Sequence, residues 1–128
     1  MESKKTTNPI QTQLLLEMGV SADTADMYRG PEQNRLTAIP SSMKGSQFGS
    51  FVSWTVDALI DYLCDDCEVC VQFSRATWDG FWICRYTRRD GETKVCVSKA
   101  GPTKIDAIFE VIYELHRNKY DTGTEKEN

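Results

Sequence analysis

The clearest pattern of apolar and polar positions lies in residues 53–118, and it predicts an α+β unit of helix, three antiparallel strands and helix. The first helix follows Thr55, a good N-cap residue, and has apolar residues at helical spacing: Val56, Leu59, Ile60 and Leu63. The three strands are predicted at Glu68–Ser74, Phe81–Arg88 and Thr93–Ser98. Thr103 and Asp106 have the spacing of a capping box, and the buried stripe of the last helix is Ile105, Ile108, Phe109, Ile112 and Leu115.

The hairpin signal Asp90-Gly91 allows the strand register to be predicted. If these two residues form the loop, Tyr86 faces Val95 and Cys84 faces Val97. One sheet face then carries the apolar set Val69, Val71, Phe73, Trp82, Cys84, Tyr86, Val95 and Val97. The other face combines Arg85, Thr87, Lys94 and Ser98 with Cys70, Phe81, Ile83 and Cys96. This second face is too apolar to be left wholly in water.

In the N-terminal part of the chain, the pattern of apolar and polar residues predicts two helices within residues 9–28. Asn8-Pro9 is a helix start and Gly19 a stop, with Ile10, Leu14, Leu15 and Met18 at helical spacing between them. Ser21 is expected to cap a second short helix, Ala22–Tyr28. Trp54 is expected to pack as a staple onto the helix that follows it.

Residues 29–52 give the weakest pattern, with two extended pieces expected at Arg35–Ala38 and Gly49–Val52. The polar ends, residues 1–8 and 120–128, are expected to be disordered. A chain of 128 residues has the usual size of one domain, so residues 1–128 are predicted to form a single domain.

Composition and charge narrow the function classes. The net charge of −4 disfavours non-specific binding to nucleic acid or anionic lipid, although a local basic patch can override it. No apolar run reaches the roughly 18 residues of a membrane span, and Met1–Thr6 lacks the apolar core of a signal peptide. A cytoplasmic protein with five reduced cysteines is therefore expected, without membrane contact.

Three cysteines, Cys64, Cys67 and Cys70, have the spacing C-x-x-C-x-x-C. This spacing is compatible with part of a zinc site or an iron–sulfur cluster, and Cys64 with Cys67 is compatible with a redox pair. Cys70 lies in a predicted strand, however, and the acidic Asp65 and Asp66 disfavour a reactive thiolate. Structural free thiols are the preferred interpretation, and no cofactor is predicted.

Catalytic residues are not predicted. His116, the single histidine, is expected near the C-terminal end of the last helix, where a cation suits the helix dipole. Asp57 and Asp61 share a helix face at a spacing of four residues and are interpreted as a solvated acidic surface. No glycine-rich phosphate loop with a lysine is present. We therefore expect a protein that is not an enzyme.

Two groups of residues in the strands are candidates for binding a macromolecule. Trp78, Phe81, Ile83 and Arg85 would form a partner-binding surface unless the N-terminal helices cover it. The basic residues Arg75, Arg85, Arg88, Arg89 and Lys104 would form a nucleic-acid-binding surface. The leading hypothesis is an accessory protein that binds another protein, with a homodimer as one form of that interaction.

The order helix–strand–strand–strand–helix resembles the double-stranded-RNA-binding domain. That domain contacts phosphates through a lysine cluster at the start of its last helix, where this chain has Lys104 and Asp106. The resemblance thus implies the topology without the binding chemistry.

Three further segments are similar to small uncharacterised proteins of Bacteroidetes genomes and their mobile elements: residues 13–28, with Leu14-Leu15-Leu16-Glu17-Met18-Gly19 and Thr24-Ala25-Asp26-Met27-Tyr28; Ser53–Leu59; and Pro102–Ala107. This resemblance implies a bacterial source, and it implies no activity and no catalytic residues.

Overall fold

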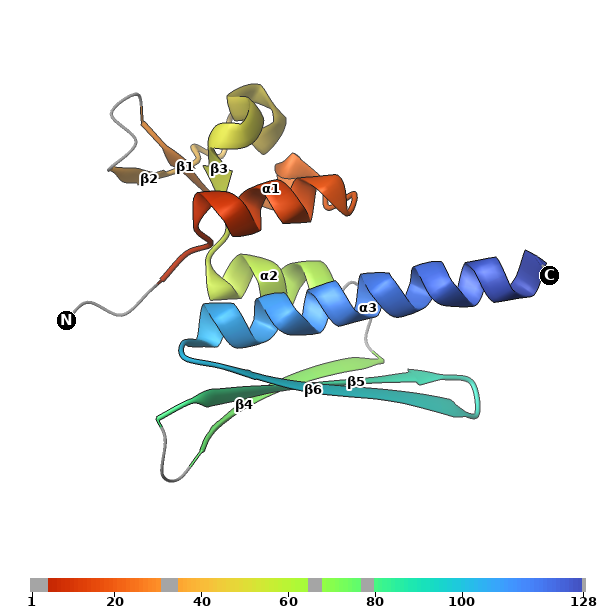
Figure 1. The fold of residues 1–128 in the computed structure, drawn as a ribbon. Coiled ribbons are helices and arrows are strands. Elements are labelled where there is room, and N and C mark those ends of the chain that lie inside the picture. The colour runs from red at the N-terminus through yellow and green to blue at the C-terminus, as the bar shows by residue number, and fades with distance from the viewer. Residues whose placement is uncertain (1–4, 31–34, 65–67, 77–79, 128) are drawn as a thin grey trace. The chain divides into compact units, whose positions relative to one another are not determined.

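A computed structural model describes residues 5–30, 35–64, 68–76 and 80–127 of the chain. The fold is α+β, as predicted, with helices and two three-stranded antiparallel sheets (Figure 1). The chain divides into two compact units, Met1–Tyr62 and Leu63–Asn128, which we call unit 1 and unit 2. Because the boundary falls at the end of the predicted first helix of the α-βββ-α unit, that helix belongs mainly to unit 1.

Unit 1 begins with helix α1 (Pro9–Glu17), which has the predicted ends. The Asn8 side chain accepts a hydrogen bond from the Gln11 N–H, and the Gln11 side chain accepts one from the Asn8 N–H. Gly19 ends the helix with a φ of 94°, a left-handed conformation that suits glycine. Leu15 is fully buried, whereas Ile10, predicted on the same apolar stripe, is 73% exposed.

The predicted second helix is wrong beyond its first turn. Residues Ala22–Thr24 form the short 3₁₀ helix η1, capped by Ser21 as expected. The chain then becomes extended, and Met27–Arg29 form strand β1. Pairing of β1 with two other strands satisfies its backbone groups, so tertiary structure overrides the local helical pattern.

The first sheet has the strand order β2-β1-β3. Strand β2 (Leu36–Ala38) confirms the first extended piece. The second is correct only at its last residue, because Gly45–Phe51 form the 3₁₀ helix η2 before strand β3 (Val52–Ser53). At Gly45 an added Cβ would lie 1.8 Å from the Ala22 carbonyl oxygen, so only glycine permits this approach of η2 to η1.

Hydroxyl groups join the start of the chain to the first sheet. Thr6 pairs with Thr55 in a β-bridge, and Thr7 is fully buried. The Thr7 hydroxyl lies 3.0 Å from the Thr12 hydroxyl and accepts a hydrogen bond from the Trp54 N–H at 3.1 Å. The expectation of a disordered N-terminus is therefore wrong for Thr6 and Thr7, whereas residues 1–4 lie outside the described residues. Polar composition indicated exposure here, but these polar groups are buried with partners.

Helix α2 (Val56–Leu63) closes unit 1 and has the predicted cap. The Thr55 hydroxyl accepts a hydrogen bond from the Ala58 N–H at 3.2 Å. The Asp26 carboxylate in turn accepts hydrogen bonds from the Thr55 N–H and hydroxyl. Trp54 is fully buried just before this helix, and its indole N–H donates to the Thr24 hydroxyl at 2.9 Å.

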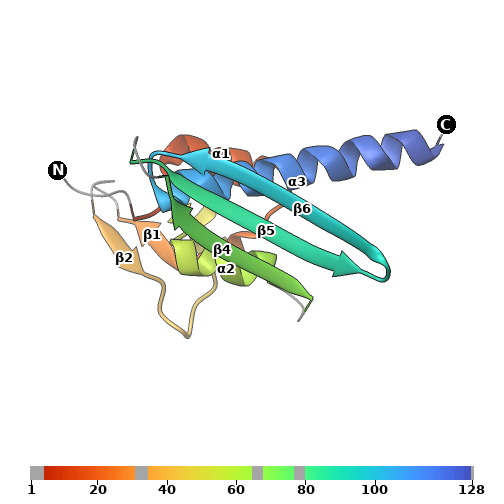
Figure 2. The same cartoon turned by 90° about the horizontal axis from the view of Figure 1, so that it is seen from below.

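Unit 2 is a meander of strands β4 (Val69–Arg75), β5 (Trp82–Asp90) and β6 (Thr93–Gly101), in that order across the sheet (Figure 2). Tyr86 lies opposite Val97, so the predicted pairing with Val95 is wrong by two residues. The reason is that Asp90 and Thr93 pair, which leaves Gly91 and Glu92 as the loop. A shift of two residues preserves side-chain alternation, so the predicted division into two faces is correct.

Helix α3 (Lys104–Glu127) packs on β5 and β6. Thr103 caps it, since its hydroxyl accepts a hydrogen bond from the Asp106 N–H. The core of unit 2 includes buried helix residues and three inward-facing strand residues: Ile105, Ile108, Ile112, Cys84, Tyr86 and Val97. The helix continues to Glu127, although we expected it to end near Arg117 and a disordered tail to start at Tyr120. Glu125, Lys126 and Glu127 are good helix formers, but Thr122, Gly123 and Thr124 before them are poor ones, so local propensity alone does not explain this continuation.

Candidate binding surface on the second sheet

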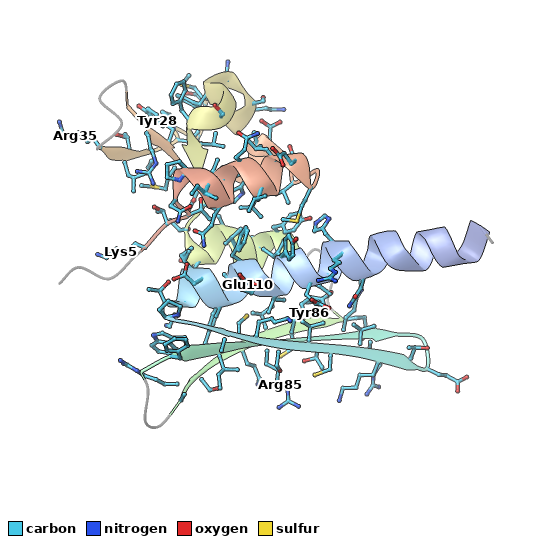
Figure 3. The ribbon with its side chains drawn as sticks, in the orientation of Figure 1. Lys5, Tyr28, Arg35, Arg85, Tyr86 and Glu110 are labelled. Atoms are coloured by element: carbon cyan, nitrogen blue, oxygen red, sulfur yellow. The ribbon has the colours of Figure 1, made fainter. Side chains whose placement is uncertain are left out.

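The face of the second sheet that points away from α3 is the candidate functional site, and we call it the outer face. Register assigns to it one alternating set from each strand: Cys70, Gln72 and Ser74; Ile83, Arg85, Thr87 and Arg89; and Lys94, Cys96, Ser98 and Ala100. Figure 3 shows the two faces at neighbouring positions, with Tyr86 directed toward α3 and Arg85 directed away from it. Tyr86 is buried and Arg85 is exposed, in agreement with this assignment.

The apolar part of the outer face lies at the N-terminal end of β5. Ile83 is half-buried on β5, and Phe81, which precedes the strand by one residue, is 41% exposed. Strand alternation places both side chains on the same face. Trp78, predicted to belong to this surface, lies outside the described residues. The structure therefore brings together three of the four predicted partner-binding residues, Phe81, Ile83 and Arg85.

The cationic part of the outer face is formed by Arg85, Arg89 and Lys94. Arg89 and Lys94 lie directly opposite each other on neighbouring strands, an arrangement of like charges that is unfavourable by itself. Among the described residues, neither has an ion-pair partner. Glu68, whose carbonyl accepts a hydrogen bond from the Arg89 N–H just before β4, lines the same part of the sheet, so one carboxylate accompanies the two cations.

A shallow depression of about 210 Å³ lies at this cationic end. Its lining includes Cys70, Thr87, Arg89 and Lys94 from the outer face, together with Glu68, Val69 and Arg88. Small-molecule sites usually enclose about 300–1,000 Å³. This open and smaller depression suits a single side chain or anionic group of a larger partner better than a whole small ligand.

The five residues predicted to bind nucleic acid do not form one surface. Arg85 and Arg89 lie on the outer face, whereas Arg88 belongs to the opposite face by register. Lys104 and Arg75 flank the Trp82 ring instead, with the Lys104 Nζ 4.7 Å and the Arg75 Cζ 5.3 Å from its centroid. Cation–π contacts of this kind hold both side chains at one end of the sheet.

The cysteines are distributed over several environments. Cys64 is half-buried, Cys70 is exposed on the outer face, and Cys84 is fully buried in the core. Burial raises the pKa of the Cys84 thiol to about 12, which keeps it protonated and unreactive. Among the described residues, no three histidine, cysteine or acidic side chains are grouped to hold a metal ion. Cys67 lies outside those residues, so the predicted cysteine triplet stays untested.

The remaining titratable residues of the sequence prediction belong to the helices α2 and α3. Asp57 and Asp61 are exposed on α2, as expected of a solvated acidic surface. His116 lies within α3 rather than near its C-terminal end, because the helix continues to Glu127. The prediction that His116 lies at the C-terminal end of the helix, where it would interact with the helix dipole, is therefore wrong.

Sequence reasoning missed the opposition of Arg89 and Lys94, because it depends on a register that is shifted by two residues. The sequence does allow the observed register: Asp90 and Thr93 can pair and leave Gly91-Glu92 as a two-residue loop, as an alternative to a loop of Asp90-Gly91.

Comparison with protein-family models, curated proteins and solved structures finds no match, so the surface itself provides the observations that bear on function. None of the helices in the described part of the chain is both long and apolar enough to cross a membrane.

Proposed function

We propose that this protein is a non-enzymatic interaction module that binds another protein through its outer face. The observation that carries the proposal is the exposure of Phe81 beside Ile83 and Arg85 on a sheet face that α3 leaves open. Apolar side chains that lie next to an arginine are typical of the centres of protein interfaces. A partner with an apolar contact and a nearby carboxylate would match both parts of this face.

A protein partner is favoured over nucleic acid by the distribution of charge. Only three cations, Arg85, Arg89 and Lys94, share the outer face, and Arg75 and Lys104 are held at Trp82. The whole chain has a net charge of −4, which opposes the approach of a polyanion. Three cations beside apolar side chains suit an acidic protein surface better than a continuous phosphate backbone.

The proposal extends to the cellular setting. We place the protein in the cytoplasm of a bacterium, where an accessory role on a mobile element would fit its resemblance to Bacteroidetes proteins. A cytoplasmic setting, which keeps thiols reduced, also agrees with Cys70, Cys84 and Cys96, which form no disulfide.

The test is quantitative affinity purification from the host cell with matched phenylalanine variants. Phe81→Asp places a charge in the proposed surface, and Phe51→Asp makes the same change at a residue of unit 1 that is 51% exposed. We expect one set of partners to be lost at least tenfold with Phe81→Asp and retained with Phe51→Asp. Equal retention by both variants would contradict the proposal.

A gel-shift titration at low salt tests the competing hypothesis. Duplex RNA and duplex DNA are each titrated with the wild type and with the variant Arg85→Glu/Arg89→Glu. We expect no shift with either duplex. A shift that is lost in the variant and falls steeply with added salt would replace the protein partner with nucleic acid.

A further inference from the structure

Strand β6 is an open edge of the second sheet along its whole length. It spans nine residues, Thr93–Gly101, and within the described part of the chain it pairs with β5 alone. Six of its residues are exposed, from Thr93 to Cys96 together with Ser98 and Ala100. An edge of this length is a template for the addition of another strand unless it is blocked.

The outward backbone groups of β6 can be identified from hydrogen bonds on the far side of β5. The Arg89 N–H donates to the Glu68 carbonyl at 3.2 Å, so odd-numbered residues of β5 direct their backbone groups toward β4. Even-numbered residues of β5 therefore bond to their partners on β6, which are odd-numbered. The backbone groups of Lys94, Cys96, Ser98 and Ala100 consequently point away from the sheet.

The sequence of β6 is nearly symmetrical about Cys96, with Lys94-Val95 before it and Val97-Ser98 after it. If two copies pair in antiparallel fashion about this residue, Cys96 faces Cys96 of the second copy. Val95 then faces Val97, and Lys94 faces Ser98. Lys99 faces Thr93, so no two lysines are opposed. Like charges directly opposite each other would disfavour pairing, and this register avoids them.

Two further features fit a second copy on this edge. Val95, on the helix side of the sheet, is 38% exposed, and pairing with Val97 of the second copy would cover it. Lysines often protect edge strands from pairing. Lys99 is tied to Glu114 of α3 by an ion pair of 3.4 Å, whereas the exposed Lys94 would face the Ser98 hydroxyl of the second copy rather than another cation. The apolar and charged positions of this edge are thus compatible with self-association.

We infer that two copies of this chain associate through antiparallel pairing of their β6 strands about Cys96. The two three-stranded sheets become one continuous sheet of six strands, with both outer faces on the same side. The inference is independent of the proposed partner, since it uses the edge of the sheet and leaves the outer faces open. It would, however, present two copies of the proposed binding surface together.

Oxidative cross-linking of the full chain tests the register. In an antiparallel hydrogen-bonded pair the Cα atoms are about 5.5 Å apart, within the range that a disulfide spans. Mild treatment with diamide should join the two Cys96 sulfurs, while each thiol loses one proton and one electron to the oxidant. We expect a covalent dimer that disappears with Cys96→Ser and persists with Cys70→Ser, the matched change at the exposed cysteine of β4.

Sedimentation equilibrium under reducing conditions tests the association itself. We expect a mass near twice the 14.6 kDa of one chain for the wild type and for Ser98→Ala. Ser98→Pro should give the monomer mass, because proline removes an outward N–H without touching the bonds to β5. An unchanged circular dichroism spectrum would show that the proline variant is folded. If it is not folded, the cross-linking comparison of Cys96→Ser with Cys70→Ser decides whether the β6 strands pair.

The inference is overturned by either of two results. A wild type that sediments as a monomer at about 100 µM would leave the edge to a strand of a different protein or to no partner. A covalent dimer that survives Cys96→Ser would place the contact between copies on another surface.

Discussion

The two units of this molecule hold their strands together in different ways. In unit 1 the strands have only two or three residues, and buried hydroxyls of Thr7, Thr12 and Ser53 connect them to the start of the chain. In unit 2 the strands have seven to nine residues, and an alternating apolar face packs on α3. Unit 1 is thus specified by individual polar contacts, and unit 2 by a repeated pattern.

This difference explains where an interaction surface can arise. A sheet stabilised through one face leaves its other face free to vary, provided that alternation is kept. Unit 2 has such a face, and it carries Phe81 and the opposed cations Arg89 and Lys94. In unit 1 the buried hydroxyls must all find partners, which restricts substitution at those positions.

The largest expected effect tests whether unit 1 depends on single buried residues. Trp54→Ala removes a fully buried ring and the hydrogen bond from its indole N–H to Thr24. We expect the free energy of unfolding to fall by about 3–5 kcal/mol, measured by urea denaturation followed by circular dichroism. The matched change in unit 2, Trp82→Ala, should cost much less, because Trp82 is only half-buried. Equal losses would contradict the contrast between the units.

The same substitution in each unit separates buried hydroxyls from surface hydroxyls. Thr7→Val preserves side-chain shape but leaves the Trp54 N–H without its bond to the Thr7 hydroxyl. We expect a loss of about 1–3 kcal/mol in the free energy of unfolding. Thr87→Val, on the outer face, should change it by less than about 0.5 kcal/mol, since valine suits a strand. If Thr7→Val is neutral, the hydroxyl network does not specify unit 1.

The same contrast determines how much of the fold could be predicted from the sequence. In unit 2 the period of two residues at Val69, Val71 and Phe73 identifies a strand and its inner face. Even the register error at Tyr86 leaves the faces intact, because a shift of two preserves alternation.

Unit 1 lacks such a period. Nothing local distinguishes Thr7, whose buried hydroxyl has the three partners Thr12, Ser53 and Trp54, from an exposed threonine. Met27 to Arg29 continue a helical pattern and become a strand only through partners that are distant in the sequence. The candidate surface was predictable in part for the same reason: alternation identified Phe81, Ile83 and Arg85, whereas the opposition of Arg89 and Lys94 required the register.

Helix caps provide a smaller and sharper test. Thr55 and Thr103 each accept a hydrogen bond of 3.2 Å from a backbone N–H three residues later. The Thr103 hydroxyl donates locally to Asp106, whereas the Thr55 hydroxyl donates to Asp26, a residue 29 positions away. Replacing either threonine by alanine should cost about 1 kcal/mol for the lost cap. Thr55→Ala should cost more, because it also breaks the link to Asp26. A larger loss for Thr103→Ala in urea titrations would reverse this ranking.

The smallest expected effect concerns Asp23, whose exposed carboxylate accepts a hydrogen bond from the Ser46 N–H at 2.8 Å. This bond lowers the pKa of Asp23 below its ordinary value of 3.8. A carboxyl group with a lowered pKa in the folded state stabilises that state above its unfolded pKa, and the contribution is lost as the pH falls through the folded pKa. The stability difference between the wild type and Asp23→Asn should therefore be constant near neutral pH and shrink below about pH 4.

Urea titrations from about pH 6 to about pH 2 would measure this difference, with Asp61→Asn as the control at an exposed aspartate of α2. The control removes a carboxylate that no described hydrogen bond ties to another segment. If the difference in the free energy of unfolding between the wild type and Asp23→Asn did not change over this pH range, the hydrogen bond from η2 to Asp23 of η1 would contribute nothing to stability. In that case η2 would be held by the close approach of Gly45 to Ala22 and by the stacking of Phe48 on Tyr28, whose ring centroids lie 4.2 Å apart. Unit 1 would then depend more on packing, and less on single polar bonds, than its buried hydroxyls indicate.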